Sequence, residues 1–137
     1  MGLYLCVFDE DEELGGVEVG TYSDFDAFRS TVIDQLEQGR SGAKYPTLIL
    51  HSDCDGEWSA ASCVTLKDEL REIADNFQRL PPRIFAVEWQ QQTAKLLGLK
   101  PLSLYDSFID VDGEPLLERL QHLCDIAIRS ERPILFQ

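Results

Sequence analysis

Two short acidic motifs are the residues in this sequence whose types and spacing could do chemistry. Residues 53–57 (DCDGE) and residues 110–114 (DVDGE) share the pattern D-x-D-G-E, and each motif precedes a predicted helix. Two carboxylates one residue apart, followed by a glycine, can bind a hard cation such as Ca²⁺. An EF-hand loop also needs an acid at its first position and a closing Glu at its last, and neither motif supplies them. We therefore expect no metal site of the EF-hand kind.

Two other roles fit the same motifs. Asp side chains accept hydrogen bonds from nearby backbone N–H groups and glycine takes a positive φ, so both motifs fit turns that lead into helices. A surface role also fits, because Asp55 and Glu57 stand beside Trp58. An aromatic anchor that excludes water around charge-assisted bonds to Arg or Lys is typical of a binding hot spot. The alternative for Trp58 is burial beneath the helix that follows.

Few residues suit nucleophilic catalysis. Cys54 and Ser52 stand near His51, but neighbouring residues on a predicted strand point to opposite faces, so His51 and Ser52 would not meet easily. His122 is a lone histidine on a predicted helix. The sequence has no GxSxG, P-loop, GxGxxG or HExxH pattern. Paired carboxylates serve glycoside hydrolases, but so acidic a chain contains many such pairs by chance. We expect a protein that is not an enzyme and that uses no cofactor.

The length of the chain and its net charge exclude further classes of function. The chain has 137 residues, with 25 acidic and 12 basic residues and a net charge of −13. This length suits one domain, residues 1–137. The charge argues against nucleic acid or an anionic membrane as the partner, because both are polyanions. No apolar run reaches the roughly 18 residues of a membrane span, and the N-terminus lacks the basic start of a signal peptide.

The cysteines predict a cytoplasmic protein, and the distribution of charge leaves two roles open. The four cysteines lack zinc-ligand spacing, so we expect reduced thiols, with Cys6 and Cys124 buried as small hydrophobic residues. Residues 1–60 hold thirteen acidic residues and three basic ones, and no base precedes Arg29. Such a region either keeps the protein soluble or forms a docking face for a basic partner, which it would attract at long range.

The elements that would position these residues follow from hydrophobic periodicity. We predict strands at residues 3–8 and 47–51, lying side by side, and short strands at 17–19 and 134–136, with an acidic loop at 9–16. Helices are predicted from Ser23 to near Gly39, from Ser59 as N-cap to about Arg79, at 89–97, and from Pro115 as first residue to about 131. The expected fold is α+β: a single compact domain in which about four helices cover a small β-sheet.

Several separated blocks of the sequence resemble the immunity protein 70 family of bacterial polymorphic toxin systems. The blocks are MGLYLCVFD at the start, VEVGTYSDF, TLILHSDCDGEW, FIDVDGEPLLERL, and RPILF near the end. They run over essentially the whole chain. The resemblance implies a cytoplasmic, non-catalytic protein that binds and neutralises a cognate toxin domain, and it leaves the toxin's activity open.

The resemblance and the charge together give a set of expected toxin-binding residues. Nuclease toxins must be basic to hold a polyanion, so an acidic protein could occupy that site. The expected residues are Asp53, Asp55, Glu57, Trp58, Asp110, Asp112 and Glu114, followed by Asp9, Glu10 and Asp11 in the acidic loop. Two alternatives stay open: an acidic regulatory or interaction module, and a divalent-cation protein that uses the two D-x-D-G-E loops. The oligomeric state is left open as well.

Overall fold

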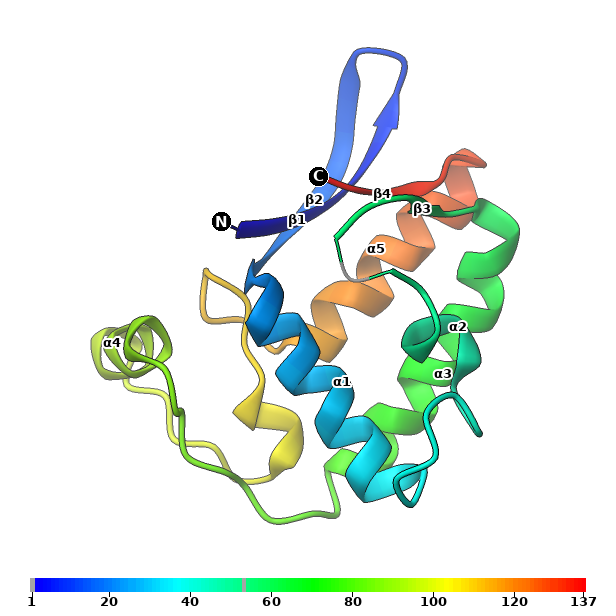
Figure 1. The fold of residues 1–137 in the computed structure, drawn as a ribbon. Helices are drawn as coiled ribbons and strands as arrows, with labels where there is room; N and C mark the ends of the chain where they lie inside the picture. The colour runs from blue at the N-terminus through cyan, green and yellow to red at the C-terminus, as the bar shows by residue number, and fades with distance from the viewer. Residues whose placement is uncertain (1, 53) are drawn as a thin grey trace.

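The computed structural model describes residues 2–52 and 54–137. In these residues, four strands and five α-helices form an α+β fold (Figure 1). The elements in chain order are β1 (Gly2–Asp9), β2 (Glu12–Thr21), α1 (Tyr22–Leu36), α2 (Pro46–Ile49), β3 (Glu57–Trp58), α3 (Ala60–Phe77), α4 (Glu88–Leu97), the 3₁₀ helix η1 (Leu104–Ser107), α5 (Leu116–Ser130) and β4 (Ile134–Phe136). The prediction of a small sheet covered by helices is confirmed, with a short fifth helix, α2, in addition.

The sheet is antiparallel and has the strand order β2-β1-β4-β3. The C-terminal strand β4 lies between β1 and β3, where Leu5 pairs with Phe136 and Trp58 pairs with Ile134. Helices α1, α3 and α5 lie on one side of the sheet, and the β1–β2 hairpin extends beyond them (Figure 1). Strand β1 is an inner strand of the sheet, and β2 and β3 are the two edge strands.

The core lies between the sheet and these three helices. Alternate residues of β1 point inward, as the two-residue period of a strand requires, and Leu3, Leu5 and Val7 are buried. The helical periodicity predicted from the sequence is confirmed along α3 and α5. Their buried faces comprise Cys63, Leu66, Leu70, Ile73 and Phe77 in α3 and Leu116, Leu120, Leu123 and Ala127 in α5. Cys6 and Cys124 are buried as expected.

The predicted strand at residues 47–51 is wrong. Residues 46–49 form the short helix α2, with Pro46 at its start. The carboxylate of Glu69, buried on α3, accepts the N–H groups of Thr47 at 3.2 Å and Leu48 at 3.0 Å. These N–H groups have no partner within the helix, so the contact from α3 stabilises the helical turn. The predicted pairing of this segment with the first strand is therefore also wrong.

The predicted acidic loop at 9–16 is wrong in extent. The chain turns tightly at Glu10 and Asp11, with Glu10 at a φ of 57°, and then continues as the ten-residue strand β2. The glycine pair Gly15-Gly16 lies within β2 rather than in a turn. A side chain at Gly16 would overlap the ring of Tyr4 on β1, so this glycine permits a close approach between the two strands.

Two predicted helix starts also shift. The N-cap of α1 is Thr21, not Ser23: the Thr21 hydroxyl accepts the N–H of Asp24 at 3.1 Å, and the Asp24 carboxylate accepts the N–H of Thr21 at 2.8 Å. This reciprocal pair is a capping box, and it starts the helix at Tyr22. Helix α5 starts at Leu116, one residue after Pro115. The N-cap of α3 is Ser59, as predicted.

Candidate functional site

The second D-x-D-G-E motif is a turn built around a buried carboxylate. Asp110 is 1% exposed, and its Oδ1 accepts the N–H groups of Asp112 and Glu114, each at 3.0 Å. Its Oδ2 lies 3.1 Å from Nε of Arg119, on α5. Gly113 has a φ of 85°, in the left-handed region that favours glycine. The helix-entry turn expected from the sequence is therefore what this loop forms.

Burial sets the protonation of Asp110. Removal from water raises its pKa above 3.8, and the N–H of Glu114 and the charge of Arg119 oppose this shift in part. A partner has almost no Asp110 surface to contact, so we remove this residue from the expected binding surface. Asp112 and Glu114 are exposed and remain available to a partner.

The described residues of the first motif are exposed, and the tryptophan that follows the motif is buried. Asp53 lies outside the described residues, and Asp55 and Glu57 are exposed. Trp58 is 3% exposed, and its indole N–H donates to the carbonyl of Thr47 at 3.0 Å. Its ring lies against Phe136 in an edge-on arrangement, with centroids 4.8 Å apart. Burial, the alternative weighed for Trp58, is therefore the observed state, and the tryptophan supports the loop from below.

The imidazole of His51 shapes the same loop. Its Nδ1 lies 2.8 Å from the carbonyl oxygen of Ser52, and its Nε2 lies 2.8 Å from the carbonyl oxygen of Glu57. The ring stacks on Phe136 with centroids 4.4 Å apart. Both ring nitrogens thus contact the backbone, and in this arrangement neither is directed at the hydroxyl of Ser52 or the thiol of Cys54.

Three of the four thiols are enclosed. Cys6, Cys63 and Cys124 are buried, and Cys54 is exposed. A hydrogen bond with Cys63, together with burial, raises the pKa of the Cys124 thiol. This pair joins α3 to α5 inside the core, where a substrate has no access.

The two acidic motifs lie at opposite edges of the sheet. The first runs into the edge strand β3, and its Gly56 carbonyl accepts the N–H of Phe136 at 3.1 Å. The second packs on the other edge strand, β2, where the N–H of Val111 donates to the Glu18 carbonyl at 2.9 Å. The repeated sequence pattern therefore does not form one joint site. Across residues 2–52 and 54–137, no group of three or more His, Cys, Asp or Glu side chains could hold a metal ion.

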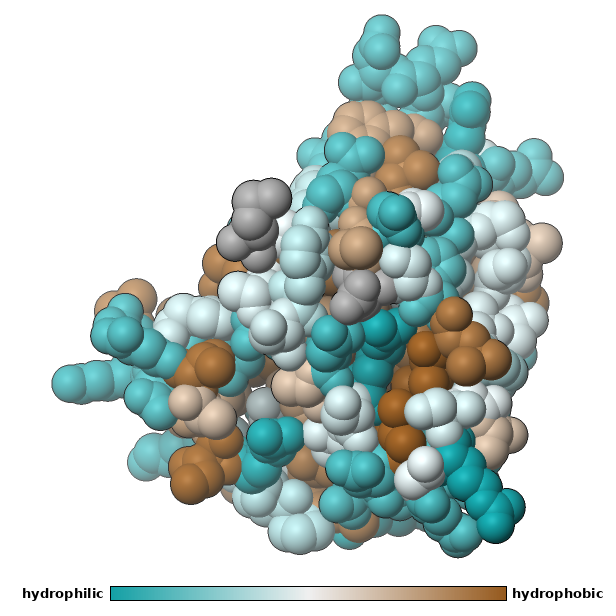
Figure 2. Space-filling model, in the orientation of Figure 1, coloured by the Kyte–Doolittle hydropathy of each residue, from teal (hydrophilic) through white to brown (hydrophobic). Residues whose placement is uncertain are grey.

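The acidic tip of the hairpin is open to solvent. Asp9, Glu10 and Asp11 are exposed at the end of β1 and in the turn, and Asp9 pairs with Arg132 at 2.7 Å. Figure 2 shows this end of the hairpin as a hydrophilic projection above the rest of the molecule. The tip of the β1–β2 hairpin extends away from the helical layer (Figure 1).

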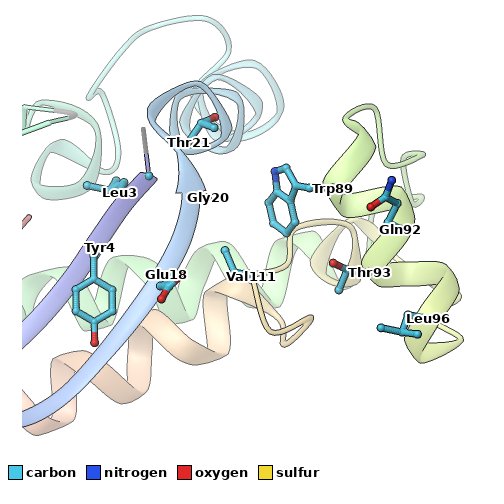
Figure 3. A pocket seen from close by; sticks show the side chains of 11 residues that line it. Leu3, Tyr4, Glu18, Gly20, Thr21, Trp89, Gln92, Thr93, Leu96 and Val111 are labelled. Carbon is cyan, nitrogen blue, oxygen red and sulfur yellow. The ribbon is translucent and has the colours of Figure 1, made fainter.

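A groove that the sequence reasoning did not identify lies beside the hairpin, between β2 and α4. It has a volume of about 580 Å³. Trp89, Gln92, Thr93 and Leu96 of α4 line one wall, and their spacing of three, one and three residues places them on one helical face (Figure 3). That spacing and a short strand at residues 17–19 were both visible in the sequence, but the sequence did not show that the helix and the strand face each other. Hydrophobic side chains also lie along the segment that carries α4 in Figure 2.

None of the helices in the described part of the chain combines the length and the hydrophobicity that a membrane span needs.

No curated protein and no solved structure matches the chain. The family model for immunity protein 70 matches residues 3–136, which is nearly the whole chain. Because this match covers nearly all of the chain, the chain belongs to the immunity protein 70 family.

Proposed function

We propose that this protein binds the toxin domain of a bacterial polymorphic toxin system in the cytoplasm and neutralises it without catalysis, through an acidic surface. The proposal is supported first by membership of a family of immunity proteins. The observation that carries the acidic part is the β1–β2 hairpin, which holds six carboxylates and no basic residue. Because no base within the hairpin offsets these carboxylates, the hairpin should attract a basic toxin at long range.

The proposed acidic surface consists of the exposed carboxylates from the expected set, which lie in three separate places: the hairpin tip and the two D-x-D-G-E loops at opposite edges of the sheet. These carboxylates are Asp9, Glu10, Asp11, Asp55, Glu57, Asp112 and Glu114. Asp53 stays a prediction for this surface, because it lies outside the described residues. Asp110 and Trp58 hold the two loops in shape from beneath the surface.

Electrostatics gives this surface two effects on a basic toxin. Complementary charge speeds the encounter by long-range attraction, by about one to three orders of magnitude at low salt. Charge-assisted hydrogen bonds from Arg and Lys to the carboxylates then hold the complex in register. If the toxin is a nuclease, the cationic site for its polyanionic substrate is the natural place for the acidic surface to dock.

Co-expression with the toxin domain encoded beside the gene for this protein tests the proposal. The wild-type protein is expected to restore growth, and the purified proteins are expected to form a complex. A triple variant, Asp9→Asn, Glu10→Gln and Asp11→Asn, is expected to associate about tenfold more slowly at low salt. A growth defect that the wild-type protein leaves uncorrected, with no complex between the purified proteins, would refute the proposed function.

A matched control separates local charge from total charge. Asp34, Asp68 and Asp75 are exposed on α1 and α3, and their triple change to Asn removes the same number of charges. This control variant is expected to keep the association rate within about twofold of wild type. Equal slowing in both variants would remove the hairpin tip from the proposed binding surface and leave only a general charge effect.

A further inference from the structure

Helix α4 stands apart from the helical layer, and the side chain of Trp89 connects it to the hairpin. Figure 1 shows it on a separate segment beside the sheet. Its Trp89 donates the indole N–H to Oδ2 of Asp24 at 2.9 Å, and the same oxygen accepts the N–H of Thr21. The Trp89 ring lies over Gly20, where a Cβ would come within 2.9 Å of Cζ2. The tryptophan therefore fixes the distance between α4 and the hairpin.

The space left between the helix and the hairpin is an apolar groove with a flat floor. Gly2 and Gly20 contribute no side chains to the strand wall, so the backbone itself forms the floor there. Val111, which follows the buried Asp110, closes one side and faces Trp89 and Leu96 across the groove (Figure 3). A volume of about 580 Å³ is within the usual range for sites that enclose a small ligand or protruding side chains.

The walls of the groove are exposed to a degree that suits a binding surface. Leu96 is 85% exposed and Val111 is 40% exposed. A single exposed leucine is ordinary on a protein surface, but a concave cluster of apolar residues with a polar rim is characteristic of an interaction site. Aromatic or aliphatic side chains from a partner would cover Leu96 and Val111 and displace water from both.

The charges around the groove select the partner. Glu18 lines the strand wall, and the described residues give it no ion-pair partner. The hairpin that continues from this wall carries five further carboxylates. The single basic residue of α4, Lys95, is not among the residues of this helix that line the groove. The partner should therefore present basic residues beside its apolar side chains.

We propose that this groove is the anchoring site for the toxin. It takes one or two bulky apolar side chains from a basic segment of the toxin, and Glu18 pairs with a neighbouring Lys or Arg of that segment. This inference rests on the proposed function and names the site at which binding energy is concentrated. A second copy of this chain fits less well, because it carries the same net charge of −13. A small polar ligand fits less well, because few polar groups converge on the groove.

The chain offers a closely matched pair of variants for the test. Leu96 and Leu102 are both 85% exposed, but only Leu96 lines the groove. Leu96→Ser and Leu102→Ser therefore delete about the same amount of exposed apolar surface. The first change lies inside the groove and the second lies outside it. Because neither leucine is buried, both variants are expected to fold, which thermal unfolding would verify.

The probe is the toxin domain encoded beside the gene for this protein, and the readout is binding kinetics. Leu96→Ser is expected to weaken binding by about tenfold or more, mainly through faster dissociation, as for a truncated hot-spot residue. Leu102→Ser is expected to stay within about twofold of wild type. Glu18→Gln is expected to reduce both affinity and its salt dependence.

The outcomes separate this inference from the proposed function. A toxin that binds wild type and Leu96→Ser equally tightly would overturn the groove proposal and leave the immunity function standing. A toxin that does not bind wild type at all would overturn both. Sedimentation of the free protein as a dimer, lost in Leu96→Ser, would assign the groove to self-association and also overturn the proposal.

Discussion

The indole N–H of Trp89 donates to Oδ2 of Asp24 across 2.9 Å, and this contact connects the groove to the start of α1. The same carboxylate oxygen accepts the backbone N–H of Thr21 at 2.8 Å and its hydroxyl at 3.0 Å. One side chain therefore completes the capping box of α1 and holds α4 beside the hairpin. The acidic hairpin, the helix it leads into and the apolar wall of the groove are positioned by this single cluster.

Loss of the Trp89 hydrogen bond should loosen α4. Trp89→Phe keeps an aromatic ring on α4 but removes the bond to Asp24. We expect a loss of about 1 kcal/mol or less in the free energy of unfolding, because one partly exposed hydrogen bond is removed. Amide hydrogen exchange in α4 should become faster while exchange in α3 is unchanged. Equal exchange in α4 before and after the change would contradict the anchoring role of Trp89.

The identity of the α1 cap can be measured directly. Thr21→Ala removes the side chain that accepts the Asp24 N–H, and we expect it to cost about 1 kcal/mol of stability. Ser23→Ala lies two residues later on an exposed position and should change stability by less than about 0.5 kcal/mol. Urea unfolding of the two variants checks both values. A larger effect at Ser23 than at Thr21 would restore the cap that the sequence predicted.

Asp110 should make stability fall as the pH rises. Its pKa is raised by burial above the unfolded value of 3.8, so the folded protein holds this proton more tightly than the unfolded chain does. The contribution of the neutral carboxyl is complete below pH 3.8 and is lost as the pH rises through the raised pKa. In Asp110→Asn the amide oxygen can still accept the two N–H groups of the turn, and no proton is exchanged.

The measurement is urea unfolding of wild type and Asp110→Asn over a series of pH values. The wild-type protein should lose stability relative to Asp110→Asn as the pH rises from about 3.5 to about 7. A difference that stays constant, or one that changes in the opposite direction, would show that Arg119 and the turn N–H groups outweigh the cost of burying the charge.

The D-x-D-G-E loops should not act as cation sites. In the second loop, Asp110 already satisfies two N–H groups and lies against Arg119, so it has no coordination to offer without breaking the turn. Calorimetry with Ca²⁺ or Mg²⁺ at millimolar concentration should show no saturable heat. Saturable binding that is lost in Asp55→Asn but kept in Asp112→Asn would place a cation at the first loop and favour the divalent-cation alternative.

Much of the fold could be predicted because its elements carry their own patterns. The apolar run at 3–8 gives β1, and the spacing of Leu66, Leu70 and Ile73 gives α3 without reference to the rest of the chain. These features are local, so they are readable from the sequence alone. The turn at Asp110 was also readable, because Asp and Gly in this pattern favour it, but the burial of Asp110 was not.

The remaining elements depend on contacts between distant residues. The segment Thr47–Ile49 is apolar enough for a strand, but side chains distant in the sequence, Glu69 and Arg29, bond its N–H groups and carbonyls and stabilise the helical turn. The groove depends on the contact between Trp89 and Gly20, which are distant in the sequence. No local sequence pattern predicts that contact. Whether an acid of the D-x-D-G-E motif faces solvent also depends on the partner it finds: Arg119 and the turn hold Asp110 inside.

The central claim is that a fixed acidic surface captures a cationic toxin, and the salt dependence of binding tests it most directly. Affinity of the wild-type protein for the neighbouring toxin domain should be measured from about 50 mM to about 500 mM salt, over which exposed charges are increasingly screened. The account predicts that affinity falls steeply, mainly through a slower association rate, and less steeply for the Asp9, Glu10 and Asp11 triple variant. An affinity that does not change with salt would contradict it.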